Sequence, residues 1–194
     1  MANDTTFFGL QVENEPSGVP LEHVSCRVLS SYGTVIALGD PVVLVAGGSI
    51  DPNSGKELPN VNRATAGDSD PIYGVVTGIY SDSFDHTKEH LPASTGGTVK
   101  VCVDNRAIYR IRYNGTTANT DEGGHCNINT GTAASVVTGK SGVCADTITH
   151  SDASGVKQLT IVGVVNEAGT SIGLNGIYRV KLNQPQIRPL GVAV

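Results

Sequence analysis

The stretch Ile108-Tyr109-Arg110-Ile111-Arg112-Tyr113 reads almost like Ile177-Tyr178-Arg179-Val180-Lys181-Leu182. In both stretches tyrosine and aliphatic residues occupy one parity, and arginine or lysine occupies the other. Because successive side chains of a strand point to opposite faces, each stretch predicts a β-strand with an apolar inner side and basic groups outside. A Gly-Val-Val run precedes each, at 74–76 and at 163–165. The echo indicates either an internal duplication or a chance likeness between strands.

The composition favours an all-β protein with many loops. Among 194 residues there are 24 Gly and 9 Pro, and Val outnumbers Leu. Residues branched at Cβ suit strands, and Gly and Pro mark turns. The length suits one large domain or two small ones. Charged residues make up only 16%, below the usual quarter of a soluble domain, which is typical of a protein that assembles.

The charge and hydropathy patterns argue against two classes of partner. The net charge is −5 and no Lys/Arg cluster occurs, so we expect no nucleic acid partner. No apolar run is long enough to span a membrane, so we expect no membrane partner. The first eight residues lack the pattern of a signal peptide, and we therefore expect the chain to be made in a cytoplasm.

Alternation and turn signals predict a barrel or a jelly-roll-like sandwich. Strands are expected near 24–30, 34–38, 42–46, 72–80, 98–103, 107–113, 134–138, 143–148, 159–165 and 177–182. Loops are expected at 47–70, at 81–97 with one short helical turn, and at 114–125. Gly74 and Gly78 predict a bulge or a close backbone contact. The short link 104–106 is of hairpin length.

The two ends of the chain are expected to be extended arms around a single β domain. We expect an N-terminal arm at 1–23, the domain at 24–182 and a C-terminal arm at 183–194. Both arms carry apolar residues outside the strand pattern. They either fold back on their own domain or lie across neighbouring subunits, where an extended segment can pair with a sheet edge.

Motifs that could carry chemistry favour a structural interpretation. Gly139-Lys140-Ser141 resembles the end of a phosphate-binding loop but lacks its first glycine. His86 and His90 have a possible metal spacing without a third ligand, and His125, Cys126 and Cys144 match no zinc module. The loop acids Asp68, Asp70, Asp121 and Glu122 are expected to be solvated. We predict no enzyme activity, no cofactor and no metal.

Four cysteines are present, at 26, 102, 126 and 144, and none forms a CxxC pair. Three disulfide connectivities are possible. In a reducing compartment free buried thiols are the default expectation.

Several stretches together resemble the capsid decoration, or cement, proteins of tailed bacteriophages. They are Phe8-Gly9-Leu10, Gly39-Asp40-Pro41-Val42-Val43-Leu44, the Gly-rich segment 123–131, Thr138-Gly139-Lys140-Ser141-Gly142-Val143, 159–165 and 178–183. The resemblance covers about two-thirds of the chain, and the segments 47–70 and 81–97 have no counterpart in it. It implies a barrel- or jelly-roll-like protein that binds the outer surface of an icosahedral capsid and clamps neighbouring major capsid subunits, often as a homotrimer.

The resulting hypothesis is a structural virion protein. Its partners would be the major capsid protein and itself, as a homotrimer or a dimer. The expected interface residues come from the two arms and the basic strand faces: Phe7, Phe8, Leu10, Arg110, Arg112, Arg179, Lys181, Ile187, Arg188 and Leu190. The alternative is a tail-associated or host-surface module that binds a glycan or receptor through its loops.

Overall fold

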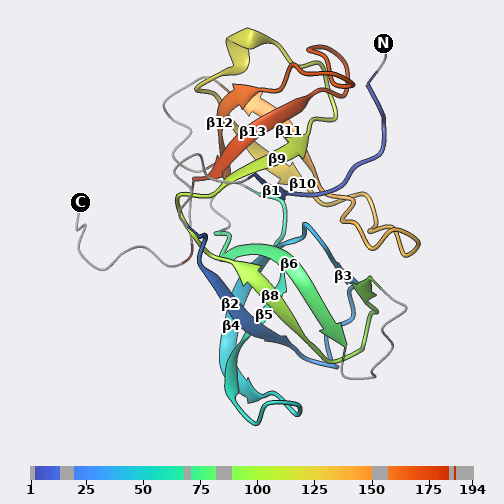
Figure 1. Ribbon diagram of the computed structural model, residues 1–194, viewed down its shortest axis with the longest axis vertical. Helices are drawn as coiled ribbons and strands as arrows, with labels where there is room; N and C mark the ends of the chain where they lie inside the picture. Colours follow the sequence, from blue (N-terminus) through green and yellow to red (C-terminus); the bar gives the residue numbers. More distant parts are fainter. Residues whose placement is uncertain are drawn as a thin grey trace, which may run out of the picture.

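The computed structural model describes residues 3–13, 20–67, 71–81, 89–149, 157–183 and 186. These residues form strands and one short 3-10 turn, so the predicted all-β class is confirmed. The elements are β1 (Gln11–Glu13), β2 (His23–Val28), β3 (Ile36–Ala37), β4 (Pro41–Ile50), β5 (Glu57–Arg63), β6 (Gly74–Ser81), β7 (His90–Leu91), β8 (Gly97–Cys102), β9 (Ile108–Arg112), η1 (Asn119–Asp121), β10 (His125–Asn129), β11 (Cys144–Thr149), β12 (Leu159–Val164) and β13 (Ile177–Leu182). Figure 1 shows two bodies stacked along the long axis.

The lower body in Figure 1 is a closed barrel with the strand order β2-β5-β4-β6-β8. β2 and β5 pair in parallel, and the other neighbours pair antiparallel. Its interior holds apolar residues from every strand, among them Cys26, Val42, Val61, Val76 and Val99. β3 and β7 form a small separate sheet.

The upper body is a six-stranded sheet with the order β1-β9-β13-β12-β10-β11. The sheet curls so far that Tyr113, just after β9, forms a parallel bridge with Ala145 in β11. We call this body the curled sheet. Its core includes Tyr109, Ile111 and Tyr178, and continues to Val75 and Cys102 of barrel strands β6 and β8. The range 24–182, predicted as one β domain, therefore contains the barrel and most of the curled sheet.

The two bodies repeat one topology. Strands β2, β4, β5, β6 and β8 of the barrel correspond in order to β9, β10, β11, β12 and β13. In each set the first strand contacts the third in parallel and the fifth antiparallel. The second strand pairs with the third and the fourth, and the fourth pairs with the fifth, all antiparallel.

The pairing register is also repeated. Gly78 in β6 pairs with Lys100 in β8, and Gly163 in β12 pairs with Arg179 in β13. Each glycine follows a bulge that leaves the preceding residue unpaired. A bulge at Gly78 was one of the two features expected from the glycines of this strand. The same register places Arg27 of β2 where β9 has Arg112. The chain is thus an internal structural repeat.

The echoed stretches are not the two copies of this repeat. β9 and β13 are adjacent strands of the curled sheet, with Arg110 opposite Arg179 and Tyr109 opposite Val180. They resemble each other because neighbouring antiparallel strands of one sheet share an inner and an outer face. The register matches Gly163 with Gly78 rather than with Gly74.

The strand predictions fail in several regions. The segment 47–70, expected as a loop, contains the end of β4 and all of β5. Val61 is the residue of β5 that joins the apolar core, so the strand has little apolar pattern. No strand was expected between 114 and 133, where β10 lies, and 136–138, expected as part of a strand, forms a turn. The link 104–106 joins no hairpin, since β8 and β9 belong to different bodies.

Candidate interaction surfaces

Two of the four basic groups of β9 and β13 form ion pairs with acids of the same chain. Arg110 forms an ion pair with Glu167. Arg179 binds Glu13 through two hydrogen bonds, Nε to Oε2 at 2.8 Å and Nη2 to Oε1 at 3.0 Å. These hydrogen bonds raise the pKa of Arg179. Because like charges directly opposite each other destabilise a sheet, the two acids are needed where Arg110 faces Arg179. Lys181 is half-buried.

Arg112 holds the N-terminal segment against the curled sheet. Its guanidinium donates hydrogen bonds to the carbonyls of Asp4, Thr6 and Asn175 and lies 5.5 Å from the ring centre of Phe8. Burial lowers the pKa of Arg112, and the carbonyl oxygens replace the water that its charge would otherwise bind. The residue predicted to face a capsid is 6% exposed and is occupied by its own chain.

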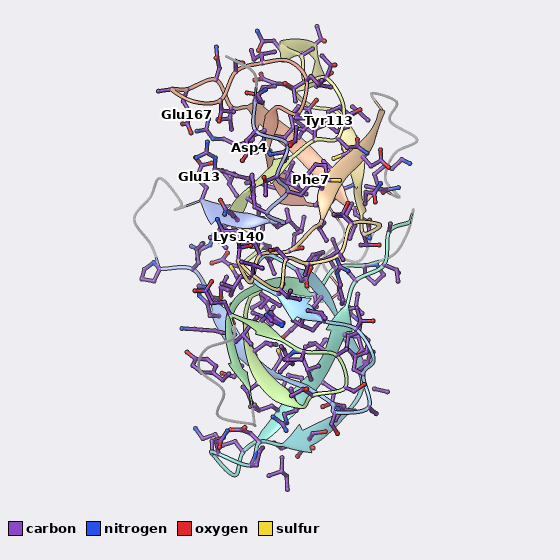
Figure 2. The ribbon with its side chains drawn as sticks, turned by 90° about the vertical axis from the view of Figure 1, so that its right-hand side faces the viewer. Asp4, Phe7, Glu13, Tyr113, Lys140 and Glu167 are labelled. Atoms are coloured by element: carbon purple, nitrogen blue, oxygen red, sulfur yellow. The ribbon has the colours of Figure 1, made fainter. Side chains whose placement is uncertain are left out.

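The described part of the N-terminal arm folds back on its own domain. Asn3 donates hydrogen bonds to the carbonyls of Ser171 and Leu174, and β1 pairs with β9. Figure 2 shows Asp4, Phe7 and Glu13 along one side of the curled sheet. Phe7 and Phe8 are half-buried. Leu10 is 1% exposed and belongs to the core, so its side chain is not on a surface as predicted.

The predicted C-terminal interface residues Ile187, Arg188 and Leu190 lie outside the described residues. The chain returns from β13 to the barrel at Gln186. Its side chain accepts a hydrogen bond from the Leu44 amide at 2.5 Å and donates one to the Leu44 carbonyl at 3.1 Å.

The barrel and the curled sheet meet at a buried carboxylate, Asp40. It accepts hydrogen bonds from Ser141 Oγ at 2.6 Å, the Ala37 amide at 2.8 Å and Arg63 Nε at 3.0 Å. Burial raises the pKa of Asp40, and the charge of Arg63 opposes that rise. Ser141 also accepts a hydrogen bond from the Val143 amide. We call this contact the junction.

Backbones approach one another closely at the junction. The Leu10 amide donates to the Gly39 carbonyl, the Leu38 amide to the Gly139 carbonyl, and the Ser141 amide to the Leu38 carbonyl. A Cβ atom on Gly9 would lie 2.5 Å from the Gly39 oxygen. Gly9, Gly39 and Gly139 have φ of 74°, 85° and 62°, a region that favours glycine. Sequence reasoning missed this site, although Gly39-Asp40-Pro41 and Gly139 were visible signals of special backbone.

Large apolar side chains are exposed at several places among the described residues, and they include Tyr80, which is 61% exposed. Val136 and Val137 are 62% and 89% exposed on a loop between β10 and β11 that projects from the body in Figure 1. Ile50 is 69% exposed at the β4–β5 hairpin, and Leu174 is 64% exposed near Asn3. Lys140, at the base of the projecting loop, is labelled in Figure 2 near the barrel.

A cavity of about 320 Å³ lies at the end of the barrel that faces the curled sheet. Its lining residues are Glu22, Val24, Tyr73, Val103, Asp104, Asn105 and Arg106. Asp104 accepts hydrogen bonds from Arg106 Nε and Nη2 at 3.0 and 2.6 Å and from the Glu22 amide at 3.2 Å. These bonds, those of Arg106 foremost, lower the pKa of Asp104.

The weaker chemical motifs have structural roles or lie outside the described residues. Ser141 of the phosphate-loop-like motif binds Asp40, and the strand β11 follows it. Asp121 is buried rather than solvated and accepts a hydrogen bond from Tyr178 at 2.5 Å. Three residues of these motifs lie outside the described part of the chain: His86, Asp68 and Asp70. Among the described residues, no group of three or more His, Cys, Asp or Glu side chains could hold a metal ion.

All four cysteines are buried and free, which confirms the prediction of free thiols.

Comparisons of the chain with family models, curated proteins and solved structures gave no match. Among the described residues, the structure contains no helix that is long and apolar enough to cross a membrane.

Proposed function

We propose that the protein is a structural virion component that binds the outer surface of an icosahedral phage capsid and clamps neighbouring major capsid subunits. It acts as a homotrimer, or alternatively as a dimer, and performs no catalysis. It reaches the capsid from the host cytoplasm and stabilises the lattice because it binds only the assembled form.

One observation carries this proposal. Three of the stretches that resemble capsid decoration proteins, Phe8-Gly9-Leu10, Gly39-Asp40-Pro41 and the segment 138–143, are far apart in sequence and meet at the junction. Their glycines are required by backbone approach, and Asp40 and Ser141 bond to each other. The shared motifs thus describe one three-dimensional unit, which supports a common architecture with that family.

Exposed apolar side chains support one location for the proposed docking. The three arginines of the basic strand faces are occupied by the chain's own acids and N-terminal segment. The projecting loop instead presents Val136 and Val137 to solvent, and adjacent apolar side chains without cover are typical of interaction sites. We therefore propose that the loop 131–140, and not the arginine face, contacts the capsid. Weak contacts of this kind, repeated over a shell, gain strength from multivalency.

The copy number in purified virions tests the proposal. Quantitative mass spectrometry, scaled to the major capsid protein, should find on the order of hundreds of copies per particle, as repeated lattice binding requires. A count of about three to twelve, the stoichiometry of a symmetric tail assembly, would contradict capsid binding and favour the tail-associated or host-surface module. Absence from virions would reject both.

A further inference from the structure

The internal repeat exposes a difference between the two bodies at one strand edge. In the curled sheet, β1 pairs antiparallel with residues 108–110 of β9. The shared register matches these residues with 23–25 of β2. Within the described ranges, β2 pairs with β5 only at Arg27 and Asn60, and no strand pairs with 23–25 on that side. His23 and Ser25 are exposed.

A cavity lies where the curled sheet has a packed side chain. Val12 of β1 is opposite Tyr109 and packs on the core, and Tyr109 is 1% exposed. The barrel residue that matches Tyr109 is Val24, which lines the cavity of about 320 Å³. This space stays open because Val24 is smaller than Tyr109 and because no described residue of the barrel takes the place of Val12.

The charge at the same edge is also unmatched. Next to Val12, Glu13 reaches across to Arg179. The register matches Arg179 with Lys100 of β8. Lys100 is exposed and forms no ion pair with any described residue. An acidic side chain placed as Glu13 is placed in the curled sheet would meet this ammonium group.

We propose that the edge of β2 at 23–25 binds an extended segment of another protein, antiparallel to β2. The segment carries a small apolar residue that enters the cavity beside Val24, followed directly by an acidic residue that reaches Lys100. Main-chain hydrogen bonds supply affinity and the two side chains supply specificity. This proposal is independent of the capsid role, because it follows from the comparison of the two bodies alone.

A capped peptide with the sequence Gly-Leu-Gln-Val-Glu, that of residues 9–13, is the probe, because residues 11–13 already pair with the matching edge of β9. Titrated into the full chain and followed by amide NMR, it should cause saturable shifts at 23–25. Lys100→Glu should weaken binding about tenfold or more, since an attraction becomes a repulsion. Lys56→Glu, the same charge change on the exposed β4–β5 hairpin, should leave affinity unchanged.

A charge swap separates recognition from misfolding. A peptide with Lys in place of its Glu should bind the Lys100→Glu protein better than it binds the unaltered chain. Shifts confined to 108–110, or no saturable shift in either protein, would overturn the proposal. So would self-association of the chain that buries 23–25, or peptide binding seen only after truncation at residue 186, because the occupant would then be a second copy or the chain's own end.

Discussion

Ser141 donates a hydrogen bond of 2.6 Å to Asp40, and this pair ties the curled sheet to the barrel. Asp40 is completely buried and also binds Arg63, whose side chain is 10% exposed. The pair therefore lies in a low-dielectric setting where every partner of the carboxylate matters.

Removing the carboxylate should destabilise the protein strongly. Asp40→Ala leaves the Arg63 charge buried without its acid, which typically costs about 3–5 kcal/mol. Urea unfolding followed by circular dichroism gives the free energy of unfolding. Glu167→Ala is the matched control, because it also removes an arginine partner, but at a half-exposed site, where ion pairs contribute at most about 1 kcal/mol. Equal losses in the two variants would show that Asp40 is not the critical tie.

Because backbones approach closely at the junction, adding a side chain there should destabilise the protein. Gly9→Ala introduces a Cβ 2.5 Å from both the Gly39 oxygen and Ser141 Cβ, at a φ of 74°. The strained backbone alone costs about 1–3 kcal/mol, and the clash adds to it. Gly33→Ala is the control, because its Cβ would meet nothing within 4 Å, and it should change stability by less than about 0.5 kcal/mol. Comparable melting temperatures for the two variants would contradict this account.

The hydrogen-bonded carboxylate of Asp104 should make the free energy of unfolding fall in acid. Its pKa is held below the ordinary value of 3.8, chiefly by the side chain of Arg106, so the unfolded chain takes up the proton more readily than the folded one. Asp104 therefore contributes stability above about pH 4 that is lost as the pH falls towards its folded pKa. The free energy of unfolding should drop less between pH 7 and pH 3 in Asp104→Asn than in the unaltered chain. An identical drop would rule out this contribution.

The thiols should be inert in the folded protein. Burial raises the pKa of Cys26 and Cys126 to about 12 and that of Cys144 to about 11. At pH 8 the thiolate, which is the reactive form, is then at most about one part in a thousand at these three cysteines, and Cys102 is shielded because it is completely buried. An aromatic disulfide reagent should react slowly with the native chain and release four equivalents in urea, matching the four cysteines. Rapid reaction of one equivalent without denaturant would identify an exposed thiol and contradict the packing.

The projecting loop gives a test of the capsid contact. Val136→Asp with Val137→Asp should reduce binding to capsids that lack the protein by roughly tenfold or more, since burying two valines is worth about 3 kcal/mol or more. Ile50→Asp, an equally exposed apolar residue at the far hairpin, is the control and should bind normally. Unchanged capsid occupancy for the loop variant would exclude this loop as the contact, without affecting the peptide edge of β2.

The strands that sequence reasoning located best are those with a clear inner and outer parity. β13 has the bounds predicted for it, and β9 lies within the range predicted for β9. Both were easy to locate because their tyrosine and aliphatic residues face the core. The two-body organisation could not be predicted, because the matching strands share register and bulges while few of their residues are identical. Lys100 and Arg179 are chemically alike, but Val24 and Tyr109 are not.

The candidate site was predicted less well than the fold. The guanidinium groups of Arg110 and Arg179 were expected to face a partner. They instead form ion pairs with Glu167 and Glu13. These acids lie far away in the sequence, so no local pattern connects them to the arginines. The junction was missed for the same reason, since Asp40 and Ser141 meet only in the folded chain. The glycines with positive φ were the detectable part of that signal.

The three backbone hydrogen bonds of the junction have a mechanical consequence. They join Leu10 to Gly39, Leu38 to Gly139 and Ser141 to Leu38, so a force that pulls the two bodies apart must load all three at once. Bonds that share a load rupture together and at a higher force than bonds that open in sequence. The molecule should therefore behave as a stiff strut rather than as two beads on a string.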